Sequence, residues 1–130
     1  MLNPNDITRA VFSHLESVAG LPDIYYVDST ETATDDHINA FIIEAKPNDL
    51  GIAYNSTVMQ SGILQLNLSV VASPRANIEG GDYVSIIAAA FPKGLRLSGV
   101  QFDKSIIARS PIAMNGFSTR IIDLEYTILD

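Results

Sequence analysis

The most regular alternation in the chain is found in Ile63-Leu64-Gln65-Leu66-Asn67-Leu68-Ser69-Val70-Val71. Successive side chains of a β-strand point to opposite faces of a sheet, so apolar residues at every second position mark one buried face. Here the even-numbered positions carry leucine or valine, and positions 65, 67 and 69 carry polar side chains. The pattern predicts a strand over 63–71 with one face in the core and the other facing water or a partner.

A second alternating strand is predicted over 117–128. It follows Asn115-Gly116, a dipeptide typical of a tight β-hairpin turn. Less regular β-rich runs predict further strands over 24–27, 41–45, 97–102 and 105–110, and the segment 52–59 is β-prone but weakly patterned. In the strand 117–128 the expected inward residues are Ile122, Leu124, Tyr126 and Ile128, and the expected outward residues are Asp123, Glu125 and Thr127.

Two segments have helical character. Asn3, Pro4 and Asp6 are typical of a helix start, and apolar residues then recur at helical spacing until Gly20, which predicts a helix over 4–19. A second helix is predicted over about 78–91, with its two adjacent glycines as a hinge into it and Asp82 as a candidate cap. The order of elements predicts an α+β fold, with a mostly antiparallel or mixed sheet and two helices packed on one face. The 130 residues fit one domain, 1–130.

Composition excludes several classes of protein. The formal net charge is −7, and the 8 basic residues are scattered along the chain rather than clustered, so tight DNA binding is not expected. Cysteine is absent, which excludes disulfides and thiolate metal sites. No apolar run approaches the ~18–20 residues that span a bilayer, and the N-terminus lacks a signal-peptide pattern. We expect a protein made in the cytoplasm, without a membrane partner.

A search for catalytic residues yields little. His14 falls on the apolar face of the first predicted helix, where a packed histidine is the simpler interpretation than a catalytic base. Asp35, Asp36 and His37 form the one cluster with metal-like chemistry, but three adjacent residues rarely converge on one ion, so we interpret them as loop and capping residues. No nucleophile elbow or phosphate-binding loop is present. The sequence predicts no catalytic residues, no metal, no cofactor and no enzymatic activity.

The order of the pieces resembles that of the tail terminator, or tail completion, proteins of long-tailed bacteriophages. The resemblance covers nearly the whole chain and includes the first helix, the short strand 24–27, and the strand 41–45 that a proline closes. Gly62 opens the next strand, which is similar to the family's Gly-x-Leu-Gln-hydrophobic strand. The helix that begins with Asp82 and ends in Phe91-Pro92-Lys93-Gly94 is similar to the family's helix ending in Phe-Pro-x-Gly, and 118–128 to its closing strand.

This resemblance implies a virion protein that forms a ring, usually a hexamer. Such a ring caps the tail tube, ends tube polymerisation and joins the tail to the head, so its partners are the tail tube protein and a head-completion or neck protein. DNA would pass through the ring without specific binding. A ring subunit needs two different contact surfaces. The apolar residues outside the regular core pattern are the candidates for the subunit interface, with ordinary core as the alternative: Tyr54, Val58, Met59 and Phe102.

Other functions remain open from the sequence. Within structural proteins, the alternative is another phage neck or tail tube subunit, since such subunits have similar sheets and contacts. In a different class, the chain is a small-molecule-binding module or a small hydrolase that uses Asp35, Asp36 and His37. A mass measurement that shows a ring favours assembly, and a metal-dependent shift in melting temperature favours the enzyme.

Overall fold

The computed structural model describes residues 4–26, 34–44, 61–97 and 99–128. Among these residues, no helix has the length and the apolar character that crossing a membrane would require. In chain order the elements are α1 (Pro4–Glu16), β1 (Asp23–Tyr26), β2 (His37–Glu44), β3 (Ser61–Val71), α2 (Ala76–Ala90), β4 (Arg96–Leu97), β5 (Val100–Gln101), β6 (Ile107–Ala108), β7 (Ile112–Met114) and β8 (Phe117–Ile128).

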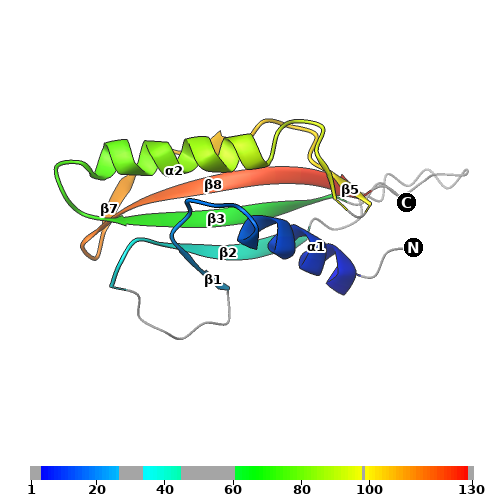
Figure 1. Cartoon of the computed structure of the whole chain (residues 1–130), viewed down its shortest axis with the longest axis horizontal. Coiled ribbons are helices and arrows are strands. Elements are labelled where there is room, and N and C mark those ends of the chain that lie inside the picture. Colours follow the sequence, from blue (N-terminus) through cyan, green and yellow to red (C-terminus); the bar gives the residue numbers. More distant parts are fainter. Residues whose placement is uncertain (1–3, 27–33, 45–60, 98, 129–130) are drawn as a thin grey trace, which may run out of the picture.

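The strands form one mixed sheet in the order β1-β2-β3-β8-β5-β4, and β6 and β7 also pair with β8. The β1–β2 pair is parallel and the other pairs are antiparallel. The centre of the sheet is the β3–β8 pair, which runs from Ser61 opposite Thr127 to Val71 opposite Phe117. The two most regular strands of the sequence are therefore direct neighbours, although the whole of α2 lies between them in the chain (Figure 1).

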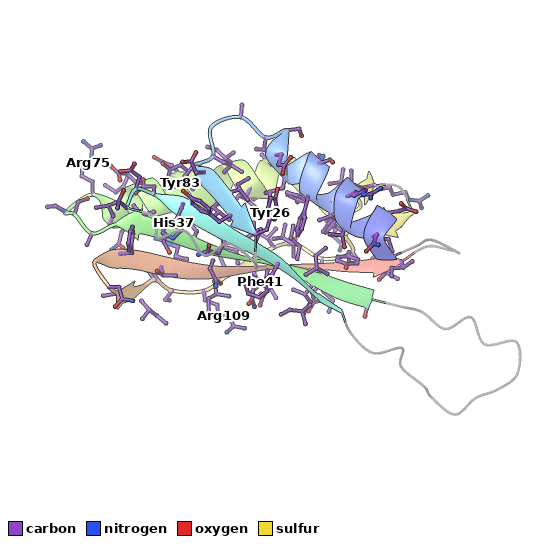
Figure 2. All side chains as sticks on the ribbon, turned by 90° about the horizontal axis from the view of Figure 1, so that it is seen from below. Tyr26, His37, Phe41, Arg75, Tyr83 and Arg109 are labelled. Atoms are coloured by element: carbon purple, nitrogen blue, oxygen red, sulfur yellow. The ribbon has the colours of Figure 1, made fainter. Side chains whose placement is uncertain are left out.

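Both helices pack on one face of the sheet, which confirms the predicted α+β fold (Figure 1, Figure 2). The core residues of β3 are the predicted ones at even positions, and Ile122, Leu124 and Tyr126 of β8 face the same way. The buried side chains that the helices add are Ile7, Val11 and Leu15 of α1, and Ala76 and Ile87 of α2.

The first helix ends earlier than predicted, at Glu16 rather than at residue 19. The backbone N–H of Ser17 donates to the carbonyls of both Ser13 and His14, and that of Val18 donates to the Leu15 carbonyl. The hydrogen bonds to His14 and Leu15 span three residues rather than four, so the final turn is tighter than an α-helical turn. His14 is a packed histidine, as expected. Its Nε2 donates to the Ala90 carbonyl at 2.7 Å, which ties the end of α1 to the end of α2.

The second helix begins at Ala76, so the prediction that Asp82 caps it and that the glycine pair forms a hinge is wrong. Both glycines lie inside the helix. A Cβ on Gly80 would lie 3.1 Å from Nε of Arg120, whose guanidinium donates to the Asn77 carbonyl at 3.1 Å. A side chain at position 80 would therefore displace the Arg120 side chain by a few tenths of an ångström, and the glycine costs about 1 kcal/mol in helix propensity.

The turn predicted at Asn115-Gly116 is confirmed. It joins β7 to β8 with Met114 opposite Phe117. Asn115 has φ 51° and Gly116 has φ 82°, and a tight hairpin turn of this kind requires positive φ at both positions. The strand predicted over 41–45 is longer at its start, because β2 begins at His37.

Two tyrosines on the helix-covered side donate hydrogen bonds to carboxylates. The Tyr26 hydroxyl donates to Glu16 of α1, and its ring contacts Phe12 with centroids 4.5 Å apart. Burial, followed by this hydrogen bond and the charge of Glu16, raises the pKa of Tyr26. Tyr83 of α2 donates to Asp36 at 3.2 Å, and its pKa is raised by burial and then by Asp36.

The raised pKa of Tyr26 predicts a loss of stability in alkali. Above about pH 10 the unfolded chain releases the phenol proton and the folded chain retains it, so the free energy of unfolding falls as the pH rises. We expect Tyr26→Phe, and to a smaller degree Glu16→Gln, to weaken this decline. Urea unfolding at about pH 8 and about pH 11 measures it. An unchanged decline in Tyr26→Phe would contradict the contribution assigned to this phenol.

Candidate interaction surface

Neither α1 nor α2 covers the second face of the sheet, which we call the open face. Its residues alternate with the core residues along β2, β3 and β8. Figure 2 shows Phe41 and Arg109 on this side of the sheet, away from the helices. The open-face residues of the three strands are His37, Asn39, Phe41 and Ile43 of β2, Ile63, Gln65, Asn67, Ser69 and Val71 of β3, and Phe117, Thr119, Ile121, Asp123 and Glu125 of β8.

Large apolar side chains are exposed on the open face. Ile107 lies opposite Asp123 and Ile112 opposite Thr119, so both side chains extend this face beyond β8. A water-facing sheet surface ordinarily carries polar residues, and a contiguous apolar patch marks an interaction site. The exposed fractions are 42% for Ile43, 41% for Val71, 51% for Ile107 and 58% for Ile112.

Charged side chains on the β8 side of the open face form ion pairs. Asp123 accepts a hydrogen bond from Gln65 at 2.8 Å and lies 3.3 Å from the Arg109 guanidinium. Lys104 lies 2.8 Å from Glu125, whose hydrogen bond and charge raise the pKa of the lysine amine. In both pairs the base is the more exposed partner, because Arg109 and Lys104 are 61% and 67% exposed against 13% and 36% for the acids. The outermost charges here are therefore positive.

Aromatic rings cluster at the other end of the open face. The His37 ring lies edge-on to Phe117, with centroids 5.1 Å apart, and to Tyr25, with centroids 5.9 Å apart. Tyr25 and Tyr26 point to opposite faces, since Tyr26 lies on the core side beside Ala40. No paired stacking platform for a base or sugar results from the two adjacent tyrosines.

The predicted Asp35-Asp36-His37 cluster does not converge on one point. Nδ1 of His37 lies 2.9 Å from the Asp35 carbonyl. Asp36 accepts hydrogen bonds from the Val71 backbone N–H at 2.8 Å and from the Tyr83 hydroxyl. Asp36 thus links the start of β2 to the end of β3 and to α2 through hydrogen bonds. This agrees with the interpretation of Asp36 as a capping residue. Among the described residues, no three acidic or histidine side chains gather as a metal site would require.

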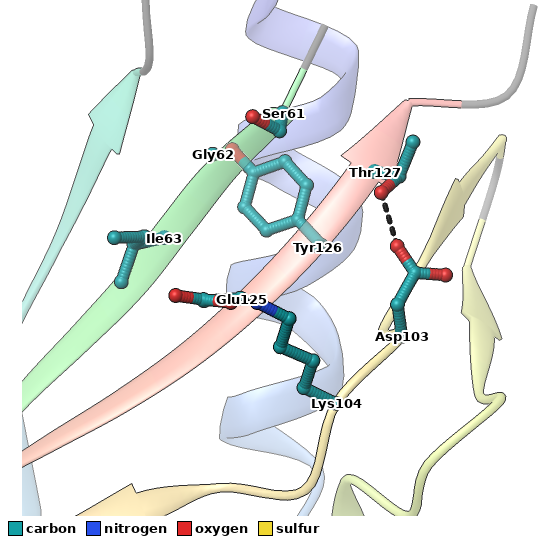
Figure 3. Close-up of a pocket in the computed structure, with 8 residues that line it drawn as sticks. All are labelled: Ser61, Gly62, Ile63, Asp103, Lys104, Glu125, Tyr126 and Thr127. Atoms are coloured by element: carbon teal, nitrogen blue, oxygen red, sulfur yellow. Dashed lines mark hydrogen bonds and ion pairs between the residues drawn. The ribbon is translucent and has the colours of Figure 1, made fainter. Parts of the chain in front are cut away.

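A pocket of about 330 Å³ lies at the end of the β3–β8 pair (Figure 3). Its charged groups already have partners within the protein, since Lys104 pairs with Glu125 and Asp103 accepts a hydrogen bond from Thr127. A small-molecule site usually offers a few polar groups directed at a ligand. Here those groups are directed at one another, which does not favour the small-molecule alternative.

Three of the four predicted interface residues, Tyr54, Val58 and Met59, lie outside the described residues. The fourth, Phe102, is only 1% exposed and packs between Phe91 and Tyr126, at centroid distances of 5.2 Å and 5.7 Å. Phe102 therefore belongs to the core and offers no surface to a second subunit. The backbone N–H of Gly94, at φ 92°, donates to the Phe102 carbonyl at 2.7 Å and holds this residue in place.

Sequence reasoning missed the residues of the open face. A signal was present in Phe41-Ile42-Ile43, where apolar residues occupy consecutive positions and so point to both faces of a strand. Ile107 and Ile112 gave no such signal, because their direction depends on how β6 and β7 pair with β8.

The comparisons with known proteins support the fold alone. No family model and no curated protein matches the chain. One solved protein structure superimposes on it with a TM-score of 0.79 and 17% sequence identity, covering 100% of this chain and 98% of the other. The chain therefore has the fold of that protein along its full length.

Proposed function

We propose that this protein is a structural subunit that assembles into a ring and caps the tail tube of a long-tailed bacteriophage. The ring stops polymerisation of the tube and presents the surface that joins the tail to the head. The observation that carries the assembly role is the open face, where four large aliphatic side chains are more than 40% exposed. A subunit of an assembly would bury these side chains in its contacts with other copies.

The resemblance to tail terminator proteins supports the specific role. The segments of this chain on which the resemblance rests have structural roles in the fold. Gly62 allows the Tyr126 ring to lie against β3, since a Cβ there would be 2.4 Å from the tyrosine oxygen. Phe91 is 1% exposed at the end of α2, and Gly94 turns the chain with positive φ. Phe91 and Gly94 thus each have a structural role in the segment Phe91-Pro92-Lys93-Gly94 of this chain.

The experiment is deletion of the gene from the phage that carries it. Cells infected by this phage are expected to accumulate filled heads beside tails that are unjoined or overgrown, because tube growth has no stop and the head has no docking surface. Electron microscopy of the lysate measures both the tail lengths and the fraction of joined particles.

Complementation separates the role of the open face from that of the fold. The wild-type chain supplied from a plasmid is expected to restore normal particles, and Ile112→Asp, on the open face, is expected not to. Ser13→Asp, at an exposed position of α1, is the matched control and restores them. Head-attached tails of normal length in the deletion phage would end the proposal.

A further inference from the structure

We infer that the open face of one copy binds the outer face of α2 of the next copy, so that subunits associate head to tail. This inference rests on the proposed assembly into a ring and names the two surfaces that meet. We use outer face for the side of α2 turned away from the sheet. Its exposed residues within Ala76–Ala90 are Asn77, Ile78, Asp82, Ser85, Ala88 and Ala89.

The outer face of α2 has a single charged residue, Asp82, and half of its exposed residues are apolar. Ile78 is 60% exposed, and the alanines at 88 and 89 are also exposed. A helix on the surface of a globular protein normally has one apolar stripe and one charged side, and a helix that is apolar all round is buried on both sides. The inner side of α2 already packs on the sheet through Ile87. The outer side, with one charge and with Ile78, Ala88 and Ala89 exposed, is suited to a second packing partner.

The most exposed charges of the two surfaces are of opposite sign, although Arg109 and Lys104 also pair with Asp123 and Glu125 on their own face. Asp82 is the one charged residue among the exposed residues of α2, and the helix has no basic residue between Ala76 and Ala90. The outermost charges on the β8 side of the open face are Arg109 and Lys104. Contact between α2 and an open face therefore brings acid to base. Pairing two copies through their α2 surfaces would instead bring Asp82 toward Asp82, which disfavours that dimer.

The positions of the two surfaces favour a repeating contact. The open face and the outer face of α2 lie on opposite sides of the same molecule, with the sheet and the helix between them (Figure 2). Each copy can therefore use both surfaces at once. A heterologous contact of this kind closes into a ring when the rotation between copies allows it.

A charge-reversal experiment tests this arrangement on the full chain. We expect Arg109→Glu alone and Asp82→Arg alone each to weaken self-association by about tenfold or more, because each sets like charges against each other. An equal mixture of the two variants is expected to regain wild-type association. In that mixture the two variants alternate. The new glutamate at position 109 of one variant then meets the new arginine at position 82 of the other, and at the next contact the native Arg109 meets the native Asp82. Sedimentation of concentrated protein gives the mass, and Arg9→Glu, an exposed residue of α1 with the same charge change, is the control.

Cross-linking provides a second measurement that does not depend on charge. The chain has no cysteine, so single cysteines can be introduced without background. A short bis-maleimide is expected to join Ala88→Cys copies to Ile43→Cys copies in a mixture, with far less product from either variant alone. Absence of this mixed product, or failure of the mixed charge variants to regain mass, overturns the inference. The proposed function fails separately, if the deletion phage makes normal tails.

Discussion

A chain with Leu66→Asp is expected not to fold. Leu66 is fully buried at the centre of β3, with Ala40 of β2 on one side and Ile122 of β8 on the other. The substitution removes a buried leucine and introduces a carboxylate that has no partner there, at a combined cost of about 4 kcal/mol or more. The free energy of unfolding of an ordinary domain is about 5–15 kcal/mol. Circular dichroism and urea titration are expected to show no cooperative transition, or one at a much lower urea concentration.

The matched control is Ile43→Asp, which places the same charge on β2 where the side chain is 42% exposed. It is expected to cost about 1 kcal/mol or less, as most surface substitutions do. If both variants unfold at the same urea concentration, the assignment of the two faces of the sheet is wrong.

Phe102→Ala is expected to lower the free energy of unfolding by about 3–5 kcal/mol. The ring of Phe102 fills the space between Phe91 and Tyr126, and its removal leaves a cavity that two rigid rings cannot close. Phe102→Leu fills part of that volume and is expected to cost less. Thermal or urea unfolding of the three proteins measures the series.

Phe41→Ala is the control for this series, because it removes the same side chain from the half-buried open face. Its cost is expected to be about 1–2 kcal/mol, since less apolar area returns to water. Equal costs at positions 41 and 102 would contradict the core position of Phe102.

The elements best predicted from the sequence are those that local patterns specify. The strict alternation of β3 and of the second half of β8 gave the correct inward faces, because each strand has a single buried face. Asn115-Gly116 gave the correct turn, because few residues adopt the backbone angles that it needs.

Other features depend on tertiary contacts that no local pattern reports. The start of α2 was placed too late, because Gly80 disfavours a helix locally and is retained where Arg120 of β8 packs against it. The first half of β2 was missed, since the polar His37 and Asn39 alternate with Ile38 and Ala40 over only four residues. The sequence predicted a second, wetter face for β3 but not its extent, because that extent depends on both helices packing on the other side of the sheet and on the pairing of β6 and β7 with β8.

The distance along the chain between the two central strands has a consequence for the folding rate. Ser69 and Thr119 hydrogen-bond across β3 and β8 although 50 residues separate them in the sequence. Domains dominated by such long-range pairing fold in about milliseconds to seconds, whereas a helix forms within about a microsecond. We therefore expect the meeting of β3 with β8 to be the slow event of folding. Until then the backbone groups of β3 that pair with β8 are unpaired, and they can pair with the same strand of another chain.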